Sequence, residues 1–160
     1  MALTFTYQKK QEMKLIIACT PSGGIGYNNK LPWSNIQGDL PRFRNLTQGQ
    51  VVVMGRNTWE SLPKKPLPNR INYVFSHHTV EGAITLSDPV FLESMKDGWI
   101  IGGASVIESC WHLIDEVHLT KTFTEYTCDA FINLLYLEQN YTCWFSEHHT
   151  DHVYQIWKRK

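Results

Sequence analysis

The chain is organised around the stretch GIGYNNKLPWSNIQGDLPRF, residues 24–43. Two glycines flank an isoleucine, a turn-prone segment leads to Leu-Pro-Trp, and a predicted helix follows whose first turn carries Asp39. Phe43 comes four residues later, and side chains at this spacing lie on one helical face. A carboxylate beside an aromatic ring is unusual for a core face, so one hypothesis is a pocket for a planar, nitrogen-rich ring. Spacing alone leaves the alternative open that Asp39 only complements the positive end of the helix.

Composition and charge argue against several classes of function. The 15 Lys+Arg residues balance 15 Asp+Glu, so no basic excess indicates a nucleic-acid-binding surface. No apolar run approaches the roughly 18 residues of a membrane span. The four cysteines are scattered without a C-x-x-C pair, which argues against a zinc site or a disulfide framework. We therefore expect a cytoplasmic protein with reduced thiols and no metal, nucleic-acid or membrane partner.

The length of 160 residues fits one domain with a sizeable core. Residues 1–12 are mixed polar and lack the apolar segment of a signal peptide. We interpret them as an N-terminal extension, with Met13 as a possible alternative start, because the first strand-like run follows Met13 directly. Residues 13–160 are then expected to form the single domain.

Hydrophobic patterns predict an α/β domain. Short apolar runs predict strands at 14–20, 51–54, 71–76, 83–86, 99–101 and 117–123, and a closing hairpin at 142–158 around His149-Thr150-Asp151. Helices are predicted at 39–48, from a cap at Asn57 or Thr58, from Ser87 to a Gly98 cap, and at 105–113 with Ser105 and Glu108 as a capping box. Alternation of strands and helices predicts a mainly parallel sheet with an antiparallel edge.

Two strand-to-helix junctions share one design, Met54-Gly55-Arg56-Asn57-Thr58 and Ile101-Gly102-Gly103-Ala104-Ser105. Glycine lets a backbone approach a ligand closely, and a helix N-terminus presents free amide donors to an anion. The pair would suit the pyrophosphate of a dinucleotide, with Arg56 adding a permanent charge. Neither junction is G-x-G-x-x-G, and two ordinary tight turns remain the alternative.

Further polar residues allow two interpretations each. Arg70 follows Pro-Leu-Pro-Asn, so it is either a carboxylate clamp or a solvated loop arginine. His77-His78 could contact a 2′-phosphate or only form a turn. The histidines near the closing hairpin have no acid at helical spacing, which argues against a metal site.

Together these stretches resemble the dihydrofolate reductase family. The matching motifs, in order, are IIA at 16–18, GIG…LPW at 24–33, DLPRF at 39–43, VVVMGRNTWESL at 51–62, PLPNR at 66–70, IIGGASV at 100–106 and HLT at 118–120. The resemblance implies an eight-stranded, mainly parallel sheet flanked by helices, with an antiparallel C-terminal hairpin. It also implies NADPH-dependent reduction of dihydrofolate to tetrahydrofolate by hydride transfer, and binding of antifolate-type small molecules. We expect a monomer.

The resemblance assigns the catalytic roles to Asp39 and Trp33. Asp39 would hold the pterin and promote its protonation, Trp33 would help to position water, and Arg70 would clamp the glutamate carboxylate. The implied substrate contacts are Ile16, Ile17, Ala18, Leu31, Asp39, Phe43, Leu67, Arg70, Ile101 and Thr120. The implied cofactor contacts are Ala18, Ile25, Gly26, Asn29, Lys30, Gly55, Arg56, Asn57, Thr58, Ser76, His77, Gly102, Gly103, Ala104, Ser105 and Val106.

The chain departs from the family pattern in three places. Five residues separate Trp33 from Asp39, Ser105 stands where many members have a basic residue, and Cys128-Asp129 stands where a loop that braces the active-site lid often has Gly-Asp.

Two other functions are alternatives: a pyrimidine reductase of the riboflavin pathway, and a catalytically silent nucleotide-binding module. Asp39 with PLPNR argues against the first, and retention of the acid and both junctions argues against the second.

Overall fold

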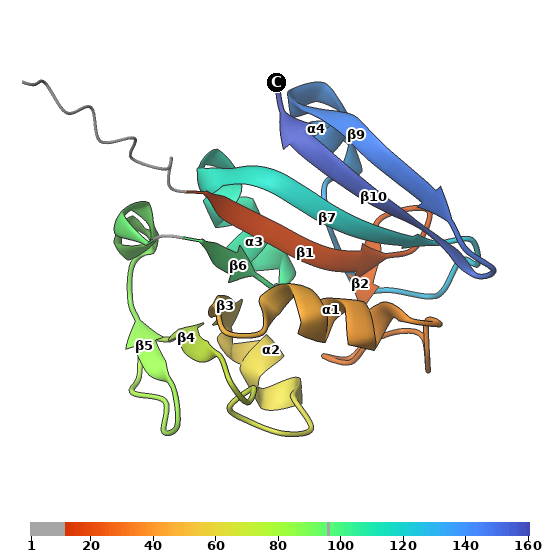
Figure 1. Cartoon of the computed structure of the whole chain (residues 1–160). Helices are drawn as coiled ribbons and strands as arrows, with labels where there is room; N and C mark the ends of the chain where they lie inside the picture. Colours follow the sequence, from red (N-terminus) through yellow and green to blue (C-terminus); the bar gives the residue numbers. More distant parts are fainter. Residues whose placement is uncertain (1–11, 96) are drawn as a thin grey trace, which may run out of the picture.

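The computed structural model describes residues 12–95 and 97–160, and its centre is an eight-stranded sheet (Figure 1). The strand order is β5-β4-β3-β6-β1-β7-β10-β9. All neighbours pair in parallel from β5 to β7, whereas β10 runs antiparallel to β7 and to β9. The predicted fold class is therefore confirmed. The strand bounds are β1 Met13–Cys19, β3 Val51–Gly55, β4 Ile71–Phe75, β5 Ile84–Leu86, β6 Gly98–Ile100, β7 Ile114–Thr122, β9 Tyr141–His148 and β10 His152–Arg159.

The central strands are apolar on both faces because both faces are covered. In β3, Val53 joins the core cluster that holds Trp111 and Tyr141, while Val52 and Met54 join the cluster that holds Trp59. Alternate side chains of a strand point to opposite faces, so one apolar run supplies two cores. The helices are α1 Asp39–Thr47, α2 Arg56–Ser61, α3 Ala104–Cys110 and α4 Leu134–Asn140, with short 3-10 helices η1 Pro89–Ser94 and η2 Trp111–Leu113.

The core clusters show which helices cover which face. Helix α3 and η2 contribute Val106, Ile107 and Trp111 to one cluster, and Leu137 of α4 belongs to it too. On the other face, α2 contributes Trp59 and Leu46 of α1 packs against the same cluster. Figure 1 shows α1 in front of the sheet and α3 behind it. The first residue of α1, Asp39, lies beside the carboxyl end of β1, because it contacts Thr120, which pairs with Ala18.

Three elements were not predicted from the sequence. Strand β2 Gly24–Gly26 pairs with β8 Ala130–Phe131 in a separate two-stranded sheet, and α4 follows shortly after β8. Strand β7 also begins at Ile114, three residues before its predicted start. Strands β2 and β8 are too short to show a hydrophobic periodicity in the sequence, and their pairing joins distant parts of the chain.

The predicted helix from Ser87 to a Gly98 cap is wrong. Only Pro89–Ser94 is helical, as a 3-10 turn, with the Asp88 side chain accepting the Val90 N–H at 2.9 Å. Gly98 instead begins β6, paired with both β1 and β3. A Cβ on Gly98 would lie 3.0 Å from Cε of Met13, so this glycine makes room for the end of the Met13 side chain in the sheet and does not cap a helix.

The predicted side-chain caps are also wrong. Helix α2 begins at Arg56 with Gly55 as its cap residue, and α3 begins at Ala104 with Gly103 in that place. Neither cap residue makes a side-chain hydrogen bond. The helices start directly at the strand ends, so Asn57, Thr58 and Ser105 already lie inside them.

The predicted closing hairpin is confirmed: the His149 N–H donates to the His152 carbonyl at 2.8 Å. None of the helices in the described part of the chain is long and apolar enough to cross a membrane.

Candidate active site

Asp39 is the first residue of α1, and it faces the central strands. Gly38 precedes it at φ 81°, a backbone conformation that glycine adopts without strain. The carboxylate accepts a hydrogen bond from the Thr120 hydroxyl at 2.7 Å, and Thr120 pairs with Ala18 across β7 and β1. The Asp39 side chain is 23% exposed, so one side of it is open to a ligand. The predicted association of Asp39 with Thr120 is thus present.

The end of β1 beside Asp39 is a half-open surface. Leu15 and Cys19 are fully buried, whereas Ile16, Ile17 and Ala18 between them are only partly buried. A central strand covered on both faces would normally bury all five residues. The partial exposure of three consecutive residues next to a half-buried acid is the arrangement that a pocket for a flat ring requires.

Phe43, four residues after Asp39 on the same helix, lies beside Arg70. The Arg70 guanidinium carbon is 5.8 Å from the centroid of the Phe43 ring. Its Nε donates to the Pro68 carbonyl at 2.9 Å, and Nη1 donates to the Thr47 hydroxyl at 3.1 Å. Burial and the nearby Arg44 charge lower the pKa of Arg70 below its ordinary value. Arg70 is therefore held in place by its own loop and is not a freely solvated side chain, as the clamp hypothesis requires.

The two glycine junctions lie side by side. The Gly55 N–H donates to the Gly102 carbonyl at 2.9 Å, and the Gly102–Gly103 peptide is cis. A Cβ on Gly55 would lie 3.0 Å from Cγ2 of Val106, and Gly102 has φ 121°. A Cβ on Gly103 would come within 3.5 Å of the Thr58 hydroxyl. The positive φ of Gly102 favours glycine there, and a methyl added at Gly55 would be tight against Val106, so two stretches of bare backbone meet at these junctions.

Arg56 and Ser76 are neighbours at the edge of these junctions. Arg56 Nη1 lies 3.5 Å from the Ser76 hydroxyl, while its Nε donates to Glu60 at 2.9 Å. The Ser76 hydroxyl also accepts the N–H of His78 at 3.2 Å. His77 is exposed on the same turn. Arg56, His77 and His78 are the residues that could supply the positive charge for a 2′-phosphate, since Ser105 has none. They therefore lie near one another.

The predicted lid begins as a tight hairpin. Tyr27 and Lys30 exchange two backbone hydrogen bonds of 2.8 and 3.0 Å, with Asn28 at φ 49° and Asn29 at φ 59° between them. Leu31 follows with 61% of its surface exposed, and it makes no apolar core contact within the described residues. An exposed leucine beside a site is consistent with the predicted substrate contact but does not test it.

The loop with Cys128 and Asp129 braces this lid despite its altered sequence. Asp129 accepts the Asn28 N–H at 3.0 Å, and its own N–H donates to the Gly26 carbonyl at 2.9 Å. A Cβ on Gly24 would lie 2.3 Å from the Cys128 sulfur, so the cysteine fills the space that Gly24 leaves open.

Trp33 is 7% exposed and packs edge-to-face on Tyr126, with ring centroids 6.2 Å apart.

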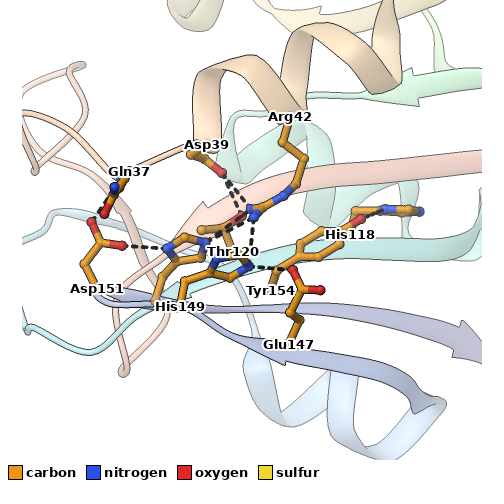
Figure 2. A network of polar contacts seen from close by, with 10 residues as sticks. Gln37, Asp39, Arg42, His118, Thr120, Glu147, His149, Asp151 and Tyr154 are labelled. Atoms are coloured by element: carbon orange, nitrogen blue, oxygen red, sulfur yellow. Dashed lines mark hydrogen bonds and ion pairs between the residues drawn. The ribbon is translucent and has the colours of Figure 1, made fainter.

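A polar network extends from Asp39 to the turn of the closing hairpin (Figure 2). Arg42, one helical turn after Asp39, has its Nη1 3.7 Å from the Asp39 carboxylate and 3.3 Å from Nε2 of His152. His152 is fully buried and is 2.7 Å from Asp151 through Nδ1. Arg42 was not predicted from the sequence, although its position three residues after Asp39 indicated a contact between the two side chains.

No group of three or more potential metal ligands occurs in the part of the chain that the structure describes.

The fold, the half-buried acid and the two glycine junctions at strand ends define an α/β domain with a ligand-binding site. A family model described as dihydrofolate reductase matches residues 12–157. A dihydrofolate reductase type 8 from Escherichia coli is 32% identical over 164 residues, covering 93% of this chain and 96% of that protein. A bifunctional dihydrofolate reductase-thymidylate synthase from Paramecium tetraurelia is 38% identical over 128 residues, but these cover 74% of this chain and only 28% of that protein.

The solved structures agree with the fold. A dihydrofolate reductase from Enterococcus faecalis, complexed with NADP(H) and RAB-propyl, superposes with a TM-score of 0.81 at 23% identity, covering 93% of this chain and 96% of that one. The chain belongs to the dihydrofolate reductase family. The family resemblance predicted from the motifs is therefore confirmed.

Proposed function

We propose that this protein reduces 7,8-dihydrofolate to 5,6,7,8-tetrahydrofolate with NADPH. The observation that carries the proposal is Asp39, a partly exposed carboxylate held by the Thr120 hydroxyl at 2.7 Å beside the open end of β1. Its family membership supports the same reaction and the same enzyme class, an oxidoreductase that supplies reduced folate for one-carbon metabolism. Neither alternative function has a specific observation in its favour.

Asp39 provides the polar end of the substrate site. Its two carboxylate oxygens can accept the paired N–H donors along one edge of a pterin, which fixes the ring over Ile16 to Ala18. Thr120 keeps one oxygen in place, so the carboxylate does not rotate away from the ring. A carboxylate beside the ring promotes protonation of the pterin near the carbon that is reduced, because a negative charge stabilises the positive charge that forms there.

Other residues would hold the remainder of the substrate. Phe43 and Leu67 are both partly buried and would contact the ring system and the aryl tail. The fixed Arg70 guanidinium would bind the glutamate carboxylate in two-point fashion, because its planar fork matches a carboxylate. Ile101 follows β6 directly and would offer its carbonyl to the pterin. Trp33, buried against Tyr126, would exclude bulk water from this end of the site.

The residues at the glycine junctions fit a dinucleotide cofactor. Bare backbone at Gly55, Gly102 and Gly103 leaves no Cβ between the two junctions and a bound pyrophosphate. Arg56 supplies a permanent positive charge, and Ser76 with His77 would complete a site for the 2′-phosphate. NADPH bound there supplies the hydride. Ala18, Ile25 and the Gly26 to Lys30 hairpin would enclose the nicotinamide.

We further propose that the protein acts as a monomer in a reducing cytoplasm and binds antifolate-type molecules in the dihydrofolate pocket. All four cysteines are free, which supports reduced thiols. Two of them, Cys19 and Cys110, are buried, and burial raises their pKa values to about 12 and about 11. Such thiols are unreactive and belong to the core and not to the site.

The test is oxidation of NADPH by the purified protein on addition of dihydrofolate, repeated with methotrexate. The proposal predicts oxidation that depends on dihydrofolate and is inhibited by methotrexate. Bound NADPH without oxidation would instead favour the silent module. Oxidation driven by a pyrimidine of the riboflavin pathway but not by dihydrofolate would favour that reductase.

A further inference from the structure

Arg42 occupies a position beside Asp39 that the proposed chemistry does not explain. Its side chain is 18% exposed, and the guanidinium carbon lies 4.2 Å from the centroid of the Tyr154 ring. Nη1 is 3.7 Å from the Asp39 carboxylate and 3.4 Å from the Thr120 hydroxyl that binds the same carboxylate. The guanidinium is therefore fixed on one face by an aromatic ring and on its edge by the acid and its hydrogen-bond donor.

The hairpin turn between β9 and β10 holds the other edge of the guanidinium. Both terminal nitrogens of Arg42 lie 3.3 Å from Nε2 of His152. A guanidinium has only donors, so this nitrogen must carry a lone pair and the ring proton must sit on Nδ1. Asp151 enforces that tautomer, because its carboxylate lies 2.7 Å from Nδ1. His152 thus accepts from Arg42 and donates to Asp151.

His149 is a weaker partner of the same guanidinium. It stacks on His152 with ring centroids 4.5 Å apart, and its Nε2 is 3.3 Å from Arg42. The same nitrogen lies 2.7 Å from the Glu147 carboxylate, which needs a proton on it. One nitrogen cannot accept from Arg42 and donate to Glu147 at once. The shorter distance assigns it to Glu147, so His152 is the partner that fixes Arg42.

Asp151 joins this network to the loop in front of α1. Its carboxylate also accepts the N–H of Gln37 at 3.0 Å, two residues before Asp39. The Gln37 N–H and the His152 ring together hold the pKa of Asp151 below its ordinary value, so this carboxylate stays charged at neutral pH. The hairpin turn therefore contacts both the start of α1 and its second turn, on either side of Asp39.

We propose that Arg42 is a positioning residue for Asp39, and that the His152–Asp151 pair of the closing hairpin holds Arg42 in place. The contact network fixes the carboxylate from the side opposite the pterin pocket. It also places a permanent positive charge 3.7 Å from the Asp39 carboxylate. This inference rests on the proposed function, since it concerns the acid that the reaction uses.

The charged and titratable groups around Arg42 come from three elements. Helix α1 supplies Asp39, the only carboxylate within ion-pair distance of Arg42 among the described residues. The hairpin turn supplies Glu147, His149, Asp151 and His152. Strand β10 supplies Tyr154; burial raises its pKa to about 12, so its ring is neutral, and its hydroxyl bonds His118 of β7 at 2.5 Å. The Arg42 charge is thus opposed directly only by Asp39.

The kinetic experiment measures single-turnover hydride transfer across pH in wild type, Arg42→Gln, Arg42→Lys and Lys158→Gln. In Arg42→Gln we expect the low-pH rate to fall about tenfold through misplacement of the acid. The pH at which the rate is halved should rise by about one unit, because a positive neighbour is lost. Arg42→Lys keeps the charge but not the planar fork, so it should restore the pH profile and only part of the rate. The affinity for NADPH should stay within twofold.

Lys158→Gln is the matched control, since it also removes one positive charge and lies on β10 away from the network. It should leave both rate and profile unchanged. An Arg42→Gln profile that coincides with wild type would overturn the inference. So would an equal shift in Lys158→Gln, because the effect would then be one of net charge.

A second experiment tests the contact between Arg42 and the closing hairpin without measuring turnover. A double-mutant cycle of Arg42→Gln with His152→Phe should give more than twofold coupling in the equilibrium constant of unfolding. Arg42→Gln with Asp151→Asn provides the same test if the buried His152→Phe variant does not fold. Coupling near unity would contradict the contact. Absence of dihydrofolate reduction by wild type would refute the proposed function, while the cycle would still decide whether the hairpin holds Arg42.

Discussion

The two ends of the candidate site are built from different kinds of contact. At the cofactor end, Gly55 and Gly102 meet backbone to backbone, and the positive φ of Gly102 favours glycine there. At the substrate end, Asp39 contacts side chains of α1 and β7, and the closing hairpin contacts Arg42 beside it. A backbone site depends on local chain geometry, whereas a side-chain network depends on partners far along the chain. Substitutions should therefore act differently at the two ends.

The largest effect is expected at the acid itself. Asp39→Asn keeps the size of the side chain but removes its charge, so dihydrofolate turnover at neutral pH should fall by about 10² to 10⁴. The NADPH dissociation constant, measured by fluorescence titration, should change less than twofold because Asp39 is not at the cofactor end. Equal losses of turnover and of NADPH affinity would remove the distinction between the two ends.

Arg70→Ala should weaken binding of dihydrofolate by about 2–5 kcal/mol, the cost of removing one partner of a buried charge pair. A pteridine without the glutamate tail should bind both proteins equally, as isothermal titration calorimetry can show. Lys64→Ala is the control, since it removes an exposed charge from the same loop. Equal weakening of the tailless ligand would exclude the clamp.

Gly102→Ala should act at the other end and mainly on the cofactor. Strain at φ 121° should cost about 1–3 kcal/mol of stability, and the added methyl should weaken NADPH binding about tenfold. Gly49 provides a matched control, because its φ is 77° and nothing lies within 4 Å of an added Cβ. Gly49→Ala should lower the stability but leave NADPH binding unchanged. Loss of NADPH affinity in both variants would mean that backbone strain alone weakens NADPH binding, and not the methyl group added at the glycine junction.

The smallest effect concerns Asp151 and its pH dependence. Since the folded state lowers the pKa of this carboxyl, it stabilises the fold above the unfolded-state pKa, and that contribution disappears as the pH falls through the folded-state value. Asp151→Asn should lower the melting temperature by about 2 °C at pH 7. The difference from wild type should shrink as the pH falls through and below the folded-state pKa of Asp151. A constant difference at all pH values would mean that the carboxylate charge is not involved.

Sequence patterns predicted most of the fold and the cofactor end. The apolar run at 51–54 and the glycines after it are local signals, and both strand and junction are where they were expected. Local signals failed where tertiary packing took precedence: Ser105 and Glu108 match a capping box, yet α3 begins at the strand end with Gly103 as cap. Gly98 was predicted as a helix cap, but it begins β6 and leaves room for the end of the Met13 side chain.

The substrate end could be predicted only in part. Asp39 is recognisable from its helix, but Arg42 meets its histidine partners 107 and 110 residues further along the chain. No local pattern encodes such a contact, so for the hairpin histidines the sequence only argued against a metal site. Once the strand order places β10 beside β7, the hairpin turn lies over the start of α1 and the network follows.

The central claim is that a hydride passes from a cofactor at the glycine junctions to a pterin held by Asp39. The most direct test is single turnover with NADPH deuterated at the nicotinamide C4 position, followed by mass spectrometry of the folate product. The account predicts tetrahydrofolate that carries one deuterium, formed by wild type and far more slowly by Asp39→Asn. Consumption of NADPH without deuterium in the folate, or equal rates in the two proteins, would contradict it.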